Sequence, residues 1–430
     1  MTFNGPSISV RRKPKHDAMQ YAIAAIALAL TSNLAAAQTT WYVDVHGAAP
    51  GSGTASSPYA SIQYAHDATT THALDTLLVA PGVYDEHLFI TKSVTIRSSG
   101  GPLATVLAPS TVGTGTVVQL NNALFEYDHT VVDGFAIRKN GTAFASCGVR
   151  ARSGTIRNCI IIGNGVGFGA FSQYDMEIDN CLVTGNYMGI TEDAYIALVY
   201  GRNNISSGNS YEDAHFQNGN CLAYTCVGIS FIFSGAGNIQ ADPQLRDLPG
   251  HDFHLLSNSP CIDSGDPTSP LDPDGSRADM GPLPFDANYA PFAIYCTAKT
   301  NSFGCVPTIG ISGTASASSS LACSITCTNE LNNKLGLLFY GFTAQNAAYQ
   351  GGYLCVASPV HRTPLIDSGG SAAGDDCSGV YSFDFNALIR SGADPALEPN
   401  AQVFAQFWSR DPNASFTTNR SDALSLRVAP

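Results

Sequence analysis

The chain has 430 residues, a formal net charge of −13 and only 13% charged residues, with 41 glycines. This length is enough for two domains. A composition rich in Gly, Asn, Ser and Thr argues against a helical bundle and favours strands and turns. The excess of acidic groups argues against nucleic acid and anionic membrane surfaces as partners. We therefore expect an all-β protein.

The first 37 residues have the pattern of an export signal. A basic stretch at 11–15 precedes the apolar run Tyr21–Leu30, and Ala35–Ala37 offers a cleavage site before Gln38. The apolar run is shorter than the roughly 20 residues that a spanning helix needs. The sequence therefore predicts a monomer that is secreted or held at the cell surface, without a membrane span after removal of the signal.

Short strands and one helix are expected directly after the signal. We expect a helix over Ser61–Thr71, because Ile62, Ala65 and Ala68 recur at helical spacing. The expected strands are Trp41–Asp44, Asp75–Tyr84, Leu88–Ile90 and Val94–Ile96. A helix before short strands suits the start of a stacked solenoid, because it covers the open apolar end and the unpaired edges of the first coil.

Between residues 130 and 210 the chain repeats itself at a spacing of about 23 residues. The rows are 130–141, 154–165, 176–187 and 199–210, and each carries one Asn near its end: Asn140, Asn164, Asn186 and Asn209. The period is too long for a single hairpin and shows no helical spacing. It fits one coil of a solenoid whose apolar face is buried only when coils stack.

Stacked coils lie about 4.8 Å apart, so equivalent residues form columns. Asn suits a turn, because it tolerates left-handed backbone geometry and stacked amides can hydrogen-bond along the axis. A row of Asn that binds sugar is the alternative. Cys159 and Cys181 share a column and either bond between coils or stack as small apolar groups. Two aliphatic columns are expected to fill the interior: Val132, Ile156 and Ile178, and Ile160, Leu182 and Ile205.

Two segments resemble known proteins. The first combines Trp41–Asp44, Pro58–Gln63, Asp75–Thr76 and Ala80–Glu86, and the second runs from Ser259–Asp266 to Ala278–Gly281. They are similar to the N-terminal and closing segments of secreted bacterial right-handed parallel β-helix proteins of the pectin-lyase-like superfamily. The resemblance implies a right-handed parallel β-helix with an N-terminal capping helix over residues 38–286. It specifies a fold much better than a reaction.

A charged column is the first candidate site. Asp133, Arg157, Asp179 and Arg202 alternate in sign, so each inner charge would have opposite neighbours one coil away. One interpretation is an exposed ion ladder in which each pair contributes about 0–1 kcal/mol. The other is a substrate groove, because polysaccharide lyases on the fold that the resemblance implies combine acidic calcium ligands with a basic Arg or Lys. The lyase motifs themselves are missing, so these four residues are only candidates for catalysis.

A second candidate is a calcium site in the stretch Asp272–Asp279. Asp272, Asp274 and Asp279 surround a Gly turn, a pattern that can wrap calcium with oxygen ligands, although the full EF-hand spacing is missing. The alternative is an acidic turn at the end of the solenoid, in which Arg277 pairs with a carboxylate. Calcium is the one cofactor that the sequence suggests.

Titratable side chains on the later coils are a third candidate. Paired carboxylates serve glycoside hydrolysis when an acid and a nucleophile or base stand at a defined separation. Surface turns of an acidic protein have the same appearance in sequence. The residues concerned are Glu192, Asp193, Glu212, Asp213 and His215.

The sequence changes in character after the Pro-rich stretch Pro282–Pro291. Short apolar runs between Gly, Asn and Ser turns predict a small β-sandwich over residues 292–430. The 12 cysteines divide evenly between the two parts, which suggests disulfides within each domain. Stretches around Cys296, Cys355 and Trp408 resemble a disulfide-bearing module appended to many large secreted bacterial proteins. Trp408 and Tyr340 either stack on a sugar ring or belong to the core.

These observations favour a secreted or surface protein that binds carbohydrate or another extracellular polymer without catalysis. The fold offers long surfaces, and a recognisable catalytic set is missing. The alternative is a polysaccharide lyase or glycoside hydrolase acting on an extracellular polysaccharide, by analogy of fold alone. A clustered, partly buried Asp/Glu/Arg set in a groove would favour the enzyme, and charges scattered over exposed turns would favour the binding protein. A purely structural surface component would bind no glycan.

Overall fold

The computed structural model describes residues 38–68, 70–110, 115–121, 130–139, 146–170, 176–192, 198–216, 221–228 and 235–430. The predicted export signal, Asn140 and Asp193 lie outside these ranges. Within the described part of the chain, no helix is long and apolar enough to cross a membrane.

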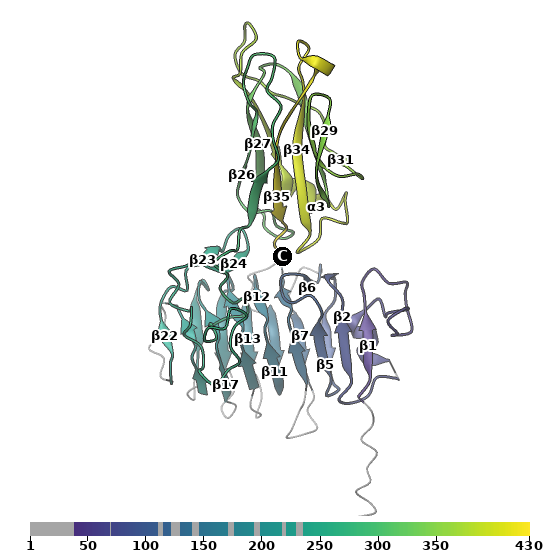
Figure 1. Ribbon diagram of the computed structural model, residues 1–430. Coiled ribbons are helices and arrows are strands. Elements are labelled where there is room, and N and C mark those ends of the chain that lie inside the picture. Colours follow the sequence, from purple (N-terminus) through teal and green to yellow (C-terminus); the bar gives the residue numbers. More distant parts are fainter. Residues whose placement is uncertain are drawn as a thin grey trace, which may run out of the picture. The chain divides into compact units, whose positions relative to one another are not determined.

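Three parallel sheets form the first part of the chain (Figure 1). Sheet A consists of β1 (Thr40–Val43), β2 (Thr76–Val79), β5 (Thr95–Ser98), β8 (Val131–Asp133), β11 (Gly154–Arg157), β14 (Met176–Asp179), β17 (Val199–Arg202) and β20 (Cys221–Ala223). Sheet B consists of β4 (Leu88–Ile90), β7 (Thr116–Leu120), β10 (Cys147–Ala151), β13 (Val166–Ala170), β16 (Met188–Glu192) and β19 (Glu212–His215). Sheet C consists of β3 (Gly82–Tyr84), β6 (Thr105–Leu107), β9 (Ala136–Arg138), β12 (Ile160–Ile162), β15 (Leu182–Thr184), β18 (Ile205–Ser206), β21 (Cys226–Val227) and β22 (Ile239–Gln240).

Successive coils supply neighbouring strands of each sheet. Val132 pairs with Ile156, and Ile156 pairs with Ile178, in parallel register across β8, β11 and β14. The predicted parallel β-helix is therefore confirmed, and so is the alignment of the repeats on which the prediction depended. Strands of only two to five residues suffice because the next coil completes both their hydrogen bonds and their apolar contacts.

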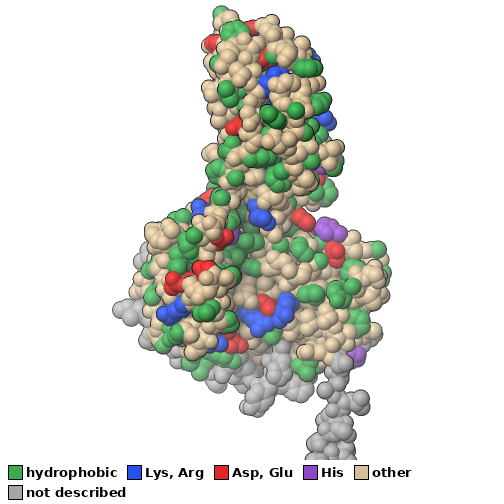
Figure 2. Space-filling view, viewed as in Figure 1, with side chains coloured by type: hydrophobic (Ala, Val, Ile, Leu, Met, Phe, Trp, Pro, Cys, Tyr) green, Lys and Arg blue, Asp and Glu red, His purple; other side chains and the backbone are tan. Residues whose placement is uncertain are grey.

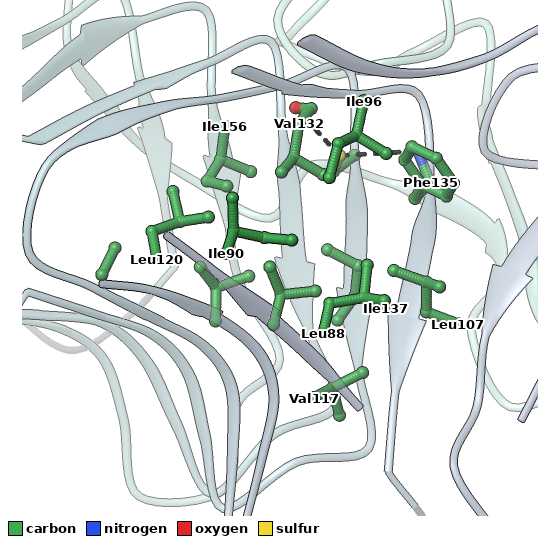
Figure 3. Packing of buried hydrophobic residues seen from close by; sticks show 14 of the residues in the cluster. Leu88, Ile90, Ile96, Leu107, Val117, Leu120, Val132, Phe135, Ile137 and Ile156 are labelled. Carbon is green, nitrogen blue, oxygen red and sulfur yellow. Dashed lines mark hydrogen bonds between the residues drawn. The ribbon is translucent and has the colours of Figure 1, made fainter. Parts of the chain in front are cut away.

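Only one of the two predicted aliphatic columns lies in the interior. Val132, Ile156 and Ile178 are fully buried among side chains from all three sheets, which point toward one another in Figure 3. The prediction for Ile160, Leu182 and Ile205 was wrong. These residues belong to a separate apolar cluster on the outer face of sheet C, and the neighbours Ile161 and Val183 face inward instead. The outward-facing residues of sheet C are covered by Phe253, Leu255, Cys261 and Met280.

The predicted amide ladder is confirmed. The Asn186 side-chain oxygen accepts hydrogen bonds from the backbone N–H and the amide of Asn164, both at 3.0 Å. The Asn209 oxygen accepts the same pair from Asn186 at 3.0 Å. The ladder ends on a charge, because the Asp213 carboxylate accepts both donors of Asn209 at 2.9 Å. Asp213 is buried, so it serves this ladder rather than an exposed site.

The ladder Asn residues in the described part of the chain do not adopt the left-handed backbone geometry that was expected of them; other residues of each coil do. The residues directly before the ladder Asn adopt it: Gly163, Gly185 and Gly208, with φ of +71°, +63° and +75°. A second Asn column that the repeat analysis did not identify also adopts it: Asn158, Asn180 and Asn203, with φ of 53°, 48° and 56°. Both sets mark the corners of the coils, where only Gly and Asn accept this conformation at low cost.

The expected capping helix is present but short. Helix α2 (Ile62–Asp67) begins at the N-cap Ser61 and buries Ile62, Ala65 and His66. Its N-terminus is held by the Glu86 carboxylate, which accepts from the Ser61 hydroxyl at 2.7 Å and from the N–H groups of Ile62 and Gln63 at 3.0 and 2.9 Å. A negative charge is favourable there because the first N–H groups of a helix are unpaired and carry partial positive charge.

The same helix closes the edge of sheet B. The Gln63 side chain accepts from the N–H of Phe89 at 2.7 Å and donates to its carbonyl at 3.2 Å, as a neighbouring strand would. The buried His66 ring accepts from the N–H groups of Thr91 and Lys92 at 3.2 Å. Burial lowers the pKa of His66, which keeps this acceptor nitrogen free of a proton. An edge strand satisfied in this way offers no template for another chain.

We expect Glu86→Ala to lower the free energy of unfolding by about 2 kcal/mol, because three donors at the helix N-terminus lose a charged partner. Urea unfolding followed by tryptophan fluorescence measures this effect, since Trp41 lies in the β-helix and Trp408→Phe removes the other tryptophan. Asp85→Asn is the control, because Asp85 is exposed and remains an acceptor for Ser110. Equal losses of unfolding free energy in the two variants would show that the Glu86 contacts do not stabilise the helix N-terminus.

The C-terminal part consists of antiparallel sheets, as expected. One sheet contains β25 (Phe292–Tyr295), β35 (Thr418–Arg427), β34 (Gln402–Arg410), β28 (Leu335–Gly341), β31 (His361–Arg362) and β32 (Ile366–Asp367). The other contains β26 (Thr308–Ser312), β27 (Ser324–Glu330) and β33 (Gly379–Asp384). The remaining elements are β23 (Leu245–Asp247), β24 (Asp252–Leu255), the hairpin β29 (Ala344–Tyr349) and β30 (Gly352–Val356), α3 (Phe385–Ser391) and a 3₁₀ turn (Ser415–Thr417).

Disulfides are present only in the C-terminal part. The bonds are Cys296–Cys355 and Cys305–Cys377. The other eight cysteines are thiols, so the expectation of bonds within each part holds for the sandwich alone. Cys159 and Cys181 therefore stack, and both are fully buried.

Candidate functional site

A row of charged side chains lies along the outer face of sheet A. Alternation along each strand turns Ile96, Val132 and Ile156 inward and their neighbours outward. We call the resulting outward row the charged strip; its members are Arg97, Asp133, Arg157, Asp179 and Arg202. Figure 2 shows blue and red side chains in small groups on the visible face of the β-helix, among a surface that is mostly uncharged.

Asp133 is the best-held member of the charged strip. Its Oδ2 accepts from Nε of Arg97 at 3.1 Å and from Nε of Arg157 at 3.0 Å, while its Oδ1 accepts from the Asn158 amide at 2.7 Å. The Asp133 side chain is 11% exposed, whereas Arg97 and Arg157 are 48% and 38% exposed. A single carboxylate therefore holds two guanidinium groups that remain partly exposed to solvent.

Arg97 was missed by the sequence analysis. It pairs in register with Asp133, so it occupies the charged column one coil before the first aligned repeat. The coil between them is longer than the later ones, with 36 residues separating Arg97 from Asp133. The alternation of sign could have indicated Arg97 once a longer coil was allowed.

The other end of the charged strip is arranged differently. Asp179 accepts from the backbone N–H of Arg202 at 2.8 Å. The Arg202 guanidinium donates to Asp266 at 2.8 Å, which lies in the segment that follows the β-helix. Of the pairs that the predicted column implied, Asp133–Arg157 is present. Arg97, which was not predicted, adds a second pair to Asp133, and Arg202 takes its partner from outside the column.

A second outward row on sheet A adds polar groups beside the charged strip. Thr155, Glu177, Tyr200 and Cys221 follow one another in register. The Thr155 hydroxyl donates to Glu177 at 2.8 Å. Burial, opposed by the hydrogen bond from the Arg202 N–H and reinforced by Glu177, raises the pKa of Asp179.

The acidic stretch of the calcium prediction organises its own loop. Asp279 accepts from the N–H groups of Asp263 and Phe285, both at 2.7 Å, and donates its own N–H to Asp272 at 2.8 Å. Burial and the neighbouring carboxylates raise the pKa of Asp272 to about 6. Asp274 accepts from Ser276. Among the described residues, no group of three or more His, Cys, Asp or Glu side chains is placed to hold a metal ion.

Arg277 does not take the carboxylate partner considered above. It donates to the Gly265 carbonyl at 2.6 Å and lies 5.6 Å from the ring centroid of Tyr224.

Of the described titratable residues of the later coils, Glu212 and His215 lie together, whereas Glu192 and Asp213 are buried at other positions. Glu192 is fully buried at the end of β16, and Asp213 ends the amide ladder. The Glu212 carboxylate and the His215 ring lie within hydrogen-bond distance, at 2.9 Å, on sheet B. Tyr340 is buried and donates to Asp394 at 2.7 Å, which places it in the sandwich core, and Trp408 is half-buried on β34.

The strand pairing and the two disulfides together decide the architecture. The chain folds as a parallel β-helix followed by antiparallel sheets. One similar solved structure is the crystal structure of pectate lyase Pel9A, which is 13% identical with a TM-score of 0.33 over 58% of this chain and 97% of that chain. That score is too low to carry a reaction over to this chain. No family model and no curated protein matches the sequence.

Proposed function

We propose that the protein acts outside the cell as a monomer that binds an extracellular polysaccharide along the charged strip without cleaving it. The observation that carries this proposal is the pair of half-exposed guanidinium groups of Arg97 and Arg157, held in place by Asp133. Such donors are fixed before a ligand arrives, so binding loses little side-chain entropy. They suit hydroxyl and carboxylate oxygens alike.

Binding without catalysis is supported by the state of Asp133. Both of its oxygens already accept hydrogen bonds, and two of the donors carry positive charge. The carboxylate is therefore engaged in holding Arg97, Arg157 and Asn158, which is a positioning role.

An extracellular location is supported by the two disulfides, which persist in oxidising compartments. The export signal that would direct the chain there remains a prediction from the sequence.

The expected consequence is that Arg97→Gln/Arg157→Gln weakens polysaccharide binding at least about 10-fold, since two charge-assisted donors are lost. Calorimetric titration with polyuronates and neutral glycans, with and without calcium, measures the affinity after a glycan array has selected ligands. Arg152→Gln is the matched control, because Arg152 is exposed on the same β-helix but follows a strand of sheet B. Unchanged affinity in the double variant would refute a binding role for the charged strip.

A second candidate function, a polysaccharide lyase or glycoside hydrolase, rests on Asp179. Its pKa is raised by burial, and Glu177 and Arg202 lie beside it. A carboxyl group whose pKa moves toward neutral is suited to proton transfer at neutral pH. Incubation with the ligands found above, followed by ultraviolet absorbance and reducing-end assays, distinguishes the two functions. New product that disappears in Asp179→Asn would establish the enzyme and overturn the binding-only proposal.

A further inference from the structure

We propose that Cys226 and Cys261 become joined by a disulfide bond when the protein folds in an oxidising compartment, covalently tying the segment 256–286 to sheet C. We call this segment the closing segment. The proposal does not depend on polysaccharide binding. It requires only that a disulfide oxidant meets the chain, as in any compartment that formed the two bonds of the sandwich.

The two thiols come from surfaces that face each other. Cys226 lies on β21 and pairs with Ile205, so it points outward from sheet C. Cys261 lies in the closing segment, where its carbonyl accepts from the N–H of Met280 at 3.1 Å. Both cysteines are fully buried in the apolar cluster between sheet C and the closing segment. Cys226 is also the neighbour that most raises the pKa of Cys261, as expected for two thiols that lie side by side in this cluster.

The stacked pair Cys159 and Cys181 also lies side by side, and Cys159 contributes to the raised pKa of Cys181, but here strand pairing sets the separation. The residues on either side pair in register, Arg157 with Asp179 and Ile160 with Leu182. Equivalent β-carbons in stacked coils therefore lie about one strand spacing, roughly 4.8 Å, apart. A disulfide needs about 3.5–4.5 Å between β-carbons, so this pair would have to compress the ladder. No ladder of hydrogen bonds fixes the separation of Cys226 from Cys261 in this way.

A covalent tie here would secure the contacts of the closing segment with the end of the β-helix. Asp266 accepts from the Arg202 guanidinium at 2.8 Å and donates its N–H to the Asn203 amide oxygen at 2.6 Å. The N–H of Gly281 donates to the Asn203 carbonyl at 2.7 Å. These contacts are made by residues that follow Cys261 in the closing segment, so the bond would help to hold the partner of Arg202 and the cover of sheet C.

The reaction is a thiol–disulfide exchange. A disulfide oxidant such as glutathione disulfide accepts two electrons and two protons from the Cys226 and Cys261 thiols, which leaves one protein disulfide and two glutathione thiols. The neighbouring Cys226 thiol and burial raise the pKa of Cys261, so the thiolate that starts the exchange is scarce in the folded protein. The bond therefore forms during folding, or when the closing segment opens.

The test is a peptide map of the full chain after refolding from urea in a glutathione redox buffer, with free thiols alkylated before digestion. Cys221→Ser serves as the background, because Cys221 is exposed and would otherwise exchange. We expect a peptide pair joined through Cys226 and Cys261, with Cys159 and Cys181 alkylated. The same protein refolded with only the sandwich bonds formed should unfold about 5–10 °C lower.

Three outcomes would overturn the proposal: alkylation of both Cys226 and Cys261 in the oxidised sample, a bond between either of them and another cysteine, or an unchanged unfolding temperature. The map of the protein with both cysteines intact needs no folding-sensitive substitution. Cys261→Ser then provides a check. Once the two sandwich bonds have formed, further oxidation should not raise its unfolding temperature, while that of Cys159→Ser should still rise.

Discussion

Replacing Asn186 by alanine is expected to destabilise the β-helix by about 4–6 kcal/mol, the sum of several buried polar groups left without partners. The Asn186 side chain donates to the carbonyls of Ile161 and Thr184, both at 3.0 Å. It also accepts two donors from Asn164 and donates to Asn209. Water cannot replace these contacts, since Asn186 is 1% exposed.

Urea unfolding in the Trp408→Phe background, with Trp41 as the reporter, measures the loss. The matched control is Asn258→Ala, because Asn258 is exposed and makes a single long contact of 3.5 Å to Gln244. It should stay within about 0.5 kcal/mol of the parent. A loss below about 1 kcal/mol for Asn186→Ala would show that the ladder does not carry the stability of the coils.

Three glycines beside the amide ladder leave the space that the ladder side chains occupy. A β-carbon at Gly148, Gly167 or Gly189 would lie 2.8–2.9 Å from a ladder amide nitrogen. At Gly189 it would also lie 2.1 Å from the Asp213 carbonyl. The ladder therefore occupies the volume that any larger residue in these positions would need.

The second large effect is expected in the sandwich, where stability should fall as pH rises toward neutrality. Glu330 is 1% exposed, and burial raises its pKa to about 7. Its oxygens accept from the Ser409 hydroxyl at 2.8 Å and from the Cys327 thiol at 3.4 Å, with no basic partner among these contacts. Asp411 adds a repelling charge.

The direction of this pH dependence follows from the number of protons bound by the folded and unfolded states. Between about pH 4.5 and 7 the unfolded state binds fewer protons than the folded state, so the free energy of unfolding decreases as pH rises through this window. A shift of this size corresponds to about 3 kcal/mol lost by pH 8. Below about pH 4.5 both states are protonated, so the stability carried by this group is fully present.

Glu330→Gln should abolish this decline, because the amide has no charge to bury. Unfolding in urea between about pH 4 and pH 8, followed by Trp408 fluorescence in a Trp41→Phe background, measures the difference from the parent. Asp375→Asn, at a partly exposed position in the same module, should retain the decline. If the two variants follow the same pH profile, burial of the Glu330 charge is not its cause.

The coils could be predicted from the sequence because each coil of a solenoid makes the same contacts with its neighbours, so the same residue types recur at a constant spacing. Asn164, Asn186 and Asn209 recur since each must hydrogen-bond to its equivalent, and Val132, Ile156 and Ile178 recur since each fills the same interior site. Residues at equivalent positions of successive repeats can therefore be inferred to be neighbours, without knowledge of the remaining fold.

The charged strip was only partly predictable. Asp133, Arg157 and Asp179 were placed correctly in one column, because the repeats there have regular length. The partners Arg97 and Asp266 were not found, since one lies across a longer coil and the other in the closing segment. An ion pair needs proximity in space, and periodicity reveals proximity only where the period is constant.

The sequence by itself determined the stacking of coils, the alignment of their columns and the change to antiparallel strands near residue 290. Only the tertiary structure decided which apolar columns face inward. Ile160 and Ile161 are both fully buried, one under the closing segment and one in the interior, so alternation of polarity cannot distinguish them. It also decided which charges are paired, because the side chains that hold Asp133 and Arg202 come from segments far apart in the chain and meet only when the sheet and its cover are assembled.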